Sequence, residues 1–470
     1  MNAILIVPPL LKYMNGPLLG PATLKGAAEA AGHRVRVLDL NICYLQERIS
    51  TTSETTLGII GDHDKPSAEL RKVEIDFVAG LRQVLPRPGA MHSIRVEPSL
   101  VPAYSHDEVA SAARALAGSE VGAWIRTRIQ NQQRPDLVGL SVLFGGQVIW
   151  GLAVSIIAKA VWPGVPVVWG GAHVTGLRDQ ITADTSYGRI VDGFVFSYAE
   201  RTFVDLLNAV ASGGPWPDAC VRAGSGTVQL AVEDRHVLPL FEDLDLYSRR
   251  LTVPAQTSRG CWYARCRFCS YPGIEMRART LPLNALDAAV RTAVSLHGVV
   301  AIKDSLVSPN RLGEIADRIA GAVPWSACTK LNPRLDADLL RRIARGGCRT
   351  LEIGLETLVP ASQILIDKQQ PAALFLAILD GAADAGISLV VNYMTGFPGE
   401  DPEEAQQHRQ RVERELEMRR PKLMAKLEHN EFELDRLAPL ATSAIVDVTG
   451  NWPWSSLLDW VVAPVLAGRG

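Results

Sequence analysis

The sequence lacks several features that would place it in a class at once. Its 470 residues hold 48 Lys and Arg against 50 Asp and Glu, a net charge of −2, so it has no basic excess for binding nucleic acid through a broad cationic surface. The seven cysteines are odd in number and sparse, which excludes a disulfide scaffold. Because 47% of the residues are hydrophobic and the net charge is small, intrinsic disorder is excluded too.

Long apolar runs are also absent. Segments 165–169 and 387–391 are largely apolar, but both fall well short of the ~20 residues that span a bilayer, and we interpret them as buried strands of parallel sheets. Segment 1–9 has no positively charged flank and no small-residue cleavage site, so a signal peptide is not expected. We therefore expect a cytoplasmic protein with reduced thiols and no membrane partner.

What the sequence does contain is two series of alternating strands and helices. The first series predicts an open, doubly wound (Rossmann-like) parallel sheet. Its expected strands are 3–7, 34–38, 137–142, 165–169 and 190–196, and its expected helices are 18–31, 147–160 and 202–211. A polar insertion at about 50–134, with expected helices at 68–84 and 106–117, interrupts this series, and a segment rich in Gly, Pro and Asp follows it as a linker.

The second series follows the linker. Its expected strands are 252–256, 299–303, 325–330, 350–354, 388–394 and 431–437, and its expected helices are 283–296, 310–320, 337–345 and 371–385. The segment Asp401-Pro402-Glu403-Glu404 predicts the start of a further, charged helix, because aspartate is a good N-cap, proline suits the first turn and glutamate completes a capping box.

Three cysteines form the motif that carries chemistry. Cys261, Cys266 and Cys269 lie within nine residues of one another after the first strand of the second series, a spacing that suits a thiolate-bound iron–sulfur cluster. Zinc is the competing metal, but Cys220 and Cys328 are not in zinc-finger spacing with this loop. Three ligands on a four-iron cluster leave one iron open to an exogenous ligand, which is a catalytic arrangement. A structural zinc or a chance group of cysteines is the alternative.

This loop resembles that of the radical S-adenosylmethionine (radical SAM) superfamily. Phe268, immediately before the last cysteine, matches the aromatic residue of the family loop, whereas the four residues between the first two cysteines replace the usual three. Segments 303–305, 351–357 and 395–400 resemble further motifs of the family, in the same order. The resemblance implies a partial TIM-type (β/α)6 barrel at 251–440 that holds a 4Fe-4S cluster and SAM.

The resemblance also implies which residues contact SAM. These expected contacts are Phe268, Asp304, Gly354, Glu356 and Asn392. For an acid at the mouth of a barrel, the alternative is a helix cap or a partner for arginine. Cys328, in the expected third barrel strand, is either a small core residue or a thiol that points inward toward substrate. The last residues, 441–470, form a C-terminal extension, and we expect its aromatic and apolar stretch 452–460 to pack over the open barrel. The alternative is that this stretch lines the substrate channel.

The N-terminal half, residues 1–215, resembles the cobalamin-binding domain of B12-dependent radical SAM enzymes. The resemblance rests on 135–142, Gln147, 169–173 and 198–202, although relatives usually show Gly-Glu-Gly-Glu where this chain has 197–200, so only the last acid is kept. The implied cobalamin contacts are Ser141, Val142, Gly170, Gly171, Ala172, His173 and Glu200. Glycines would let the backbone approach a bulky ligand closely. The alternative is a domain that has lost cobalamin and only supports the barrel.

The cobalt-binding histidine signature of classical methyltransferases, Asp-x-His-x-x-Gly, is absent after the first strand. His33 is followed by Arg-Val-Arg instead. If cobalamin binds, its lower face is therefore expected to lack a histidine ligand, which favours giving up a methyl group to a carbon radical. His63 and His173 are the alternatives as partners of cobalt or phosphate, although a lone histidine is more often a hydrogen-bonding loop residue.

The resemblance implies an enzyme in which a 5′-deoxyadenosyl radical removes hydrogen from an unactivated carbon of a peptide or small natural-product substrate, and methylcobalamin then supplies a methyl group. It also implies an electron donor such as flavodoxin or ferredoxin, and no nucleic-acid partner is expected. Two alternatives stay open: rearrangement or cyclisation without methylation, and a non-catalytic cobalamin or iron–sulfur sensing module. The domain boundaries expected are 1–215, a linker at 216–250, the barrel at 251–440 and the extension at 441–470.

Overall fold

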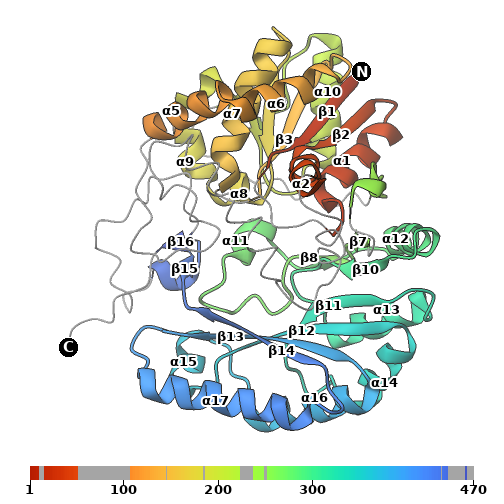
Figure 1. The fold of residues 1–470 in the computed structure, drawn as a ribbon, viewed down its shortest axis with the longest axis vertical. Helices are drawn as coiled ribbons and strands as arrows, with labels where there is room; N and C mark the ends of the chain where they lie inside the picture. Colours follow the sequence, from red (N-terminus) through yellow and green to blue (C-terminus); the bar gives the residue numbers. More distant parts are fainter. Residues whose placement is uncertain are drawn as a thin grey trace. The chain divides into compact units, whose positions relative to one another are not determined.

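The computed structural model describes residues 1–9, 15–50, 106–143, 146–183, 186–222, 237–247, 251–435, 437–442 and 461–462. The described residues form two compact units, one up to residue 247 and the other from residue 251 onward (Figure 1). No helix within these ranges is long and apolar enough to cross a membrane. The expected helix at 68–84, much of the insertion, and His63 lie outside the described residues.

A six-stranded sheet forms the centre of the first unit. Its strands are β1 (Asn2–Val7), β2 (Arg34–Asp39), β3 (Leu137–Ser141), β4 (Val167–Gly170), β5 (Gly193–Val195) and β6 (Cys220–Val221). They lie in the order β2-β1-β3-β4-β5-β6, and every neighbouring pair is parallel except β5–β6. The order 2-1-3-4-5 is that of flavodoxin-like, doubly wound sheets. The predicted fold class of this half is therefore confirmed.

Both faces of this sheet are buried. Its helices are α1 (Leu19–Ala30), α2 (Leu40–Ser50), α5 (His106–Ala117), α6 (Glu120–Gln130), α7 (Gly146–Val161), α8 (Ala172–Gly176), α9 (Arg178–Ala183) and α10 (Glu200–Ser212), with 3-10 turns η3 (Ser186–Arg189) and η4 (Leu244–Leu246). Ile4 and Ile6 of β1 pack with residues of α5, α6 and α7, whereas Ala3 and Leu5 pack with residues of α1 and α10. Because strands buried on both faces are continuously apolar, β1 could be recognised in the sequence.

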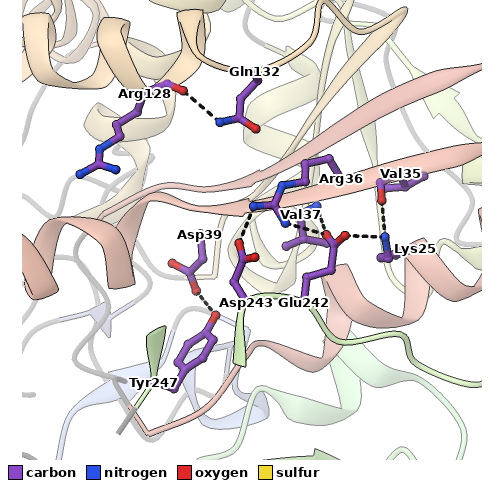
Figure 2. Close-up of polar contacts among 10 residues, drawn as sticks. All are labelled: Lys25, Val35, Arg36, Val37, Asp39, Arg128, Gln132, Glu242, Asp243 and Tyr247. Carbon is purple, nitrogen blue, oxygen red and sulfur yellow. Dashed lines mark hydrogen bonds and ion pairs between the residues drawn. The ribbon is translucent and has the colours of Figure 1, made fainter. Parts of the chain in front are cut away.

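The described part of the linker, residues 237–247, packs against α1 and the edge strand β2, and we call it the strap (Figure 2). The carboxylate of Glu242 accepts hydrogen bonds from Nζ of Lys25 and from the backbone N–H of Val37, both at 2.7 Å. It also pairs with the guanidinium of Arg36 at 3.4 Å. The strap thus satisfies a backbone donor of an edge strand that would otherwise be open to another chain.

The end of the strap reaches the carboxyl end of β2. The hydroxyl of Tyr247 donates to Oδ2 of Asp39 at 2.9 Å, and the N–H of Ile42 donates to the other carboxylate oxygen at 2.9 Å. Burial raises the pKa of Asp39. A Cβ on Gly26 would lie 1.9 Å from the carbonyl oxygen of Leu238, so the strap approaches α1 as closely as a glycine permits.

The second unit is built on six parallel strands that lie side by side in sequence order (Figure 1). They are β7 (Thr252–Ala255), β10 (Val299–Ile302), β11 (Trp325–Thr329), β12 (Cys348–Glu356), β13 (Ser388–Thr395) and β14 (Ala425–Glu431). The helices are α11 (Tyr271–Glu275), α12 (Asn284–Ser295), α13 (Pro309–Ile319), α14 (Ala337–Arg345), α15 (Pro360–Leu365), α16 (Ala372–Ala385) and α17 (Pro402–Arg419). This is the expected partial (β/α)6 barrel.

Short elements complete this unit. They are β8 (Ser258–Arg259), β9 (Arg279–Thr280), η5 (Pro439–Thr442), β15 (Leu434–Asp435) and β16 (Val461–Val462). Asp401 caps α17 as expected, because its side chain accepts a hydrogen bond from the N–H of Glu404 at 2.8 Å.

The expected sixth barrel strand at 431–437 is wrong. The sixth strand is β14, which pairs with β13 from Leu389↔Ala425 to Thr395↔Glu431. It was missed because an edge strand needs little apolar sequence, and Ala-Lys-Leu-Glu-His-Asn-Glu is largely polar. The apolar Leu434 instead belongs to the two-residue strand β15, which pairs antiparallel with β16.

Candidate active site

The three cysteines lie on the loop that follows β8, beyond the carboxyl end of the first barrel strand. Gly260 opens the loop with φ +71°, and a Cβ there would lie 2.9 Å from backbone atoms of Arg277 and Ala278, so only glycine fits. The N–H of Gly260 donates to Oε2 of Glu275 at 3.1 Å, and the hydroxyl of Ser305 donates to the same oxygen. Glu275 therefore ties the start of the loop to the residues that follow β10.

All three cysteines are partly buried free thiols. The N–H of Ala264 donates to Sγ of Cys261 at 3.4 Å, and the N–H of Cys269 donates to the carbonyl of Cys266 at 3.2 Å. Burial raises the pKa of Cys266 to about 11 and that of Cys269 to about 12, so each keeps its proton until a metal displaces it. Phe268 is partly buried beside them. Across the described ranges, no three His, Cys, Asp or Glu side chains form a group that could hold a metal ion.

Asp304, one of the expected SAM contacts, follows β10 and is 4% exposed. Its carboxylate accepts hydrogen bonds from the N–H and the hydroxyl of Thr257, at 2.7 and 2.6 Å, and from the hydroxyl of Ser258 at 2.7 Å. These bonds hold the turn between β7 and β8 against the end of β10. Asp304 thus braces the base of the cysteine loop, and a direct contact with SAM stays a prediction.

The end of β12 carries a buried ion pair between Glu356, an expected SAM contact, and Lys368. Nζ of Lys368 lies 2.5 Å from Oε1 of Glu356, and the two side chains are 8% and 11% exposed. Burial by itself would lower the pKa of Lys368, but the carboxylate of Glu356, together with Cys266 and Cys328, raises it overall. A Cβ on Gly354 would lie 2.3 Å from Oε1 of Glu356 and 2.6 Å from Nζ of Lys368. A side chain at 354 would therefore displace this pair from its present position.

The expected contact Asn392 lies on the inner face of the barrel. On β13, Val391 and Tyr393 are fully buried, whereas Asn392 between them is partly exposed. Asn392 is aligned with Gly354 of β12, and its Nδ2 donates to Oε1 of Glu352 at 2.7 Å. Asn392 and Glu352 therefore place an amide and a carboxylate inside the barrel.

Cys328 also faces this side of the sheet. It is aligned with Glu352, and its two neighbours in the strand, Ala327 and Thr329, are more deeply buried than it is. Burial and then the carboxylate of Glu352 raise the pKa of Cys328 to about 12, so its thiol is protonated and unreactive as a nucleophile.

The expected cobalamin contacts lie at the carboxyl ends of β3 and β4 and at the start of α10. Ser141, Gly170, Gly171 and Ala172 are partly exposed, whereas Val142, His173 and Glu200 are buried. This edge of a doubly wound sheet is where ligands bind. The partly exposed residues therefore form a strip that is open to a ligand on the first unit.

Gly171 holds this strip in shape. It has φ +115°, and a Cβ there would lie 2.3 Å from the carbonyl oxygen of Val142. The same carbonyl accepts a hydrogen bond from the N–H of His173 at 3.3 Å. Thr175 donates to the carbonyl of Gly171 at 2.9 Å and accepts from the N–H of Ser197 at 2.8 Å. Close packing of the backbone thus requires glycine at position 171, and hydrogen bonds connect the ends of β3, β4 and β5.

Sequence reasoning did not single out Lys368, Glu352 or the residues that contact the tip of the cysteine loop. Lys368 lies 12 residues after Glu356 in the chain, in a turn without regular structure. Only the fold shows that Lys368 and Glu356 both lie close enough to Cys266 for their charges to affect the pKa of its thiol. The structure therefore brings the cysteine loop and the end of β12 together.

Comparison with known proteins agrees with this geometry. Residues 256–412 match the family model of the Radical SAM superfamily. No curated protein sequence is significantly similar to the chain. The second unit is therefore a radical SAM domain, as the cysteine loop predicts.

Solved structures match almost the whole chain. The radical SAM methyltransferase TsrM from Kitasatospora setae, solved with tryptophan substrate and a SAM analogue, has a TM-score of 0.62 and 16% identity, over 93% of this chain and 74% of TsrM. The cobalamin-dependent SAM radical enzyme OxsB, solved with aqua-cobalamin and SAM, has a TM-score of 0.59 and 16% identity, over 91% of this chain and 53% of OxsB. The chain shares the fold of both enzymes, and the expected architecture is confirmed.

Proposed function

We propose that the chain is a cobalamin-dependent radical SAM enzyme that transfers a methyl group to an unactivated carbon of a peptide or small natural-product substrate. The proposal is carried by one observation: a radical SAM cysteine loop on a partial barrel, in a chain that also folds a flavodoxin-like sheet. TsrM, which shares this fold, is a methyltransferase and has been solved with cobalamin and a 4Fe-4S cluster. When bound, the cluster and SAM supply a 5′-deoxyadenosyl radical and methylcobalamin supplies the methyl group.

The residues present are of the type that holds an iron–sulfur cluster, although the three sulfur atoms are not gathered as a metal-binding group among the described residues. Cys261, Cys266 and Cys269 supply three thiols from one loop, which is the donor type that such clusters use. The N–H of Ala264 already donates to Sγ of Cys261, and hydrogen bonds to sulfur help to set the potential of a cluster. With three protein ligands, the cluster would keep one iron free for the amino and carboxylate groups of SAM.

The chain's own residues would orient SAM and substrate. Glu356 at the end of β12 is fixed by Lys368, so its carboxylate is held in one place near Cys266. Asn392 and Glu352 offer an amide and a carboxylate inside the barrel, where they can accept hydrogen bonds from a polar substrate. These groups are fixed before substrate binds, so little has to be reorganised on binding.

The first unit fits a large ligand at the edge of its sheet. The partly exposed strip of Ser141 and 170–172 lies at the carboxyl ends of β3 and β4, where doubly wound folds bind cofactors. We propose that cobalamin contacts this strip, and that the buried residues Val142, His173 and Glu200 support the strip. OxsB, which shares the fold, has been solved with aqua-cobalamin bound.

The proposal is tested by turnover of SAM. Protein that is purified without oxygen and loaded with iron, sulfide and cobalamin is expected to form 5′-deoxyadenosine and S-adenosylhomocysteine when it receives SAM and reduced flavodoxin. Cys266→Ala should abolish 5′-deoxyadenosine, whereas Cys43→Ala, far from the loop in sequence, should not. If protein that carries both cofactors forms neither product, the proposal is wrong. Once a substrate is found, a product heavier by one CH₂ supports methylation, and a product of another mass supports rearrangement.

A further inference from the structure

The gap between Cys261 and Cys266 has four residues, one residue more than the usual pattern, and one of the four adopts an unusual backbone conformation. Ala264 in this gap has φ +46°, a left-handed conformation that residues other than glycine rarely adopt. The conformation brings its N–H to Sγ of Cys261. The residues on either side of it, Tyr263 and Arg265, make their contacts with a distant part of the chain.

Both of these residues contact Asp367, in the turn that follows α15. The hydroxyl of Tyr263 donates to the carbonyl of Asp367 at 2.8 Å. Nε and Nη2 of Arg265 donate to the two carboxylate oxygens of Asp367 at 3.2 and 3.0 Å, a two-pronged contact that fixes direction as well as distance. Nζ of Lys330 lies 3.3 Å from the centroid of the Tyr263 ring, within the range of a cation–π interaction. We call Tyr263, Arg265, Lys330 and Asp367 the loop anchor.

The turn that carries Asp367 is itself held firmly. Asp367 has φ +49°, which aspartate tolerates better than most residues. The preceding residue, Ile366, is fully buried, and its carbonyl accepts a hydrogen bond from the N–H of Arg267 at 3.0 Å. The following residue, Lys368, is paired with Glu356 on β12. The anchor therefore connects the tip of the cysteine loop to a turn that is fixed on the barrel.

We propose that the loop anchor positions Cys261 and Cys266 for the iron–sulfur cluster by holding the longer gap in one conformation. The inference rests on the proposed function, since it assumes a cluster on these cysteines. Without the anchor, the four residues of the gap would sample more backbone conformations, and ordering them would cost free energy each time the cluster forms. Tyr263 and Arg265 are thus positioning residues, which act on the cluster through the backbone of the loop.

The test compares anchor variants with a matched pair elsewhere on the same unit. The anchor variants are Arg265→Ala, Asp367→Asn and the double variant Tyr263→Phe/Arg265→Ala; asparagine also tolerates the left-handed conformation, so Asp367→Asn removes the charge alone. Arg318 of α13 donates two hydrogen bonds to Asp287 of α12, and Arg318→Ala removes an exposed pair of the same kind. The readouts are the rate at which a chelator removes iron from the reconstituted full-length protein and the electron paramagnetic resonance spectrum of the reduced cluster.

Iron loss should be roughly twofold to fivefold faster in Arg265→Ala, because an exposed ion pair is worth little. It should be roughly tenfold faster in the double variant, which also loses a partly buried hydrogen bond. The double variant should also show a broadened or second resonance signal, because Cys261 then occupies more than one position. Arg318→Ala should match the wild type in both readouts, and circular dichroism should be unchanged in all variants.

The outcomes separate this inference from the proposed function. Wild-type protein that binds no cluster after reconstitution overturns the proposed function, and the anchor with it. Wild-type protein that binds a cluster, together with anchor variants that behave like Arg318→Ala, overturns the anchor alone. Arg265→Lys gives a further check: lysine keeps the charge but not the two-pronged contact, so its rate of iron loss should lie between those of wild type and Arg265→Ala.

Discussion

Replacing Lys368 by methionine tests how the end of β12 is held. The change removes the ammonium and keeps most of the side-chain volume, so the carboxylate of Glu356 stays buried without its partner 2.5 Å away. Removing one member of a buried ion pair costs about 3–5 kcal/mol. We therefore expect Lys368→Met to lower the free energy of unfolding by about 3 kcal/mol near neutral pH, at the low end of this range.

The pH dependence of the free energy of unfolding follows from the directions of the pKa shifts. In the wild type, the raised pKa of Lys368 means that its pairing stabilises the fold fully below pH 10.5 and is lost as the pH rises through the raised value. The variant lacks the positive charge that offsets the burial of the Glu356 side chain, so we expect its stability relative to the wild type to rise as the pH falls.

The assay is urea unfolding of the full-length protein, followed by circular dichroism at about pH 5 and about pH 8, on either side of the range in which a buried carboxyl group titrates. Lys159→Met is the matched control, because Lys159 pairs with Asp192 at 2.8 Å but both side chains are 30% exposed, and its loss should be about 1 kcal/mol or less. The double variant Lys368→Met/Glu356→Gln should recover part of the stability. A loss below about 1 kcal/mol in Lys368→Met, or a double variant no more stable than the single one, would refute the reasoning.

Three further predictions concern other parts of the chain. Gly171→Ala should destabilise the first unit by about 2–5 kcal/mol in urea unfolding, because its Cβ meets Val142 at 2.3 Å in addition to the strain of the left-handed backbone, whereas Gly164→Ala has open space and should cost only about 1–2 kcal/mol. Because burial raises the pKa of Asp39, the contribution of Asp39 to stability falls as the pH rises from 3.8 through the raised value; over this range the urea midpoint of Asp39→Asn should therefore rise relative to that of the wild type. Cys328→Ala should keep the full iron content of the reconstituted protein by colorimetric assay, and loss of iron would mean that Cys328 is a ligand.

Much of the fold could be predicted because its signals are local. The strand at 3–7 is apolar on both faces and the observed strand is Asn2–Val7. The expected helices at 106–117 and 337–345 match His106–Ala117 and Ala337–Arg345. The latter begins where the side chain of Asp336 accepts a hydrogen bond from the N–H of Leu339, an interaction between neighbours in sequence.

The rest depends on contacts between residues far apart in the chain. The edge strand β14 is polar, and its place is set by its pairing with β13. The carboxylate of Asp304 is held by Thr257 and Ser258, 47 and 46 residues away, so its role as a brace could not be read from the segment around it. The anchor joins Arg265 to Asp367, 102 residues away, and no local pattern signals such a pair.

In the proposed enzyme, one chain holds both an iron–sulfur cluster and cobalamin, with the cluster on the loop of Cys261, Cys266 and Cys269. The most direct measurement is the ultraviolet–visible spectrum, together with iron analysis, of protein reconstituted without oxygen. We expect about four irons per chain and the absorption bands of both cofactors, and a variant with all three cysteines changed to alanine should lose the iron and keep the cobalamin. Folded wild-type protein that fails to take up either one of the two cofactors, or a triple variant that keeps its iron, would contradict this assignment.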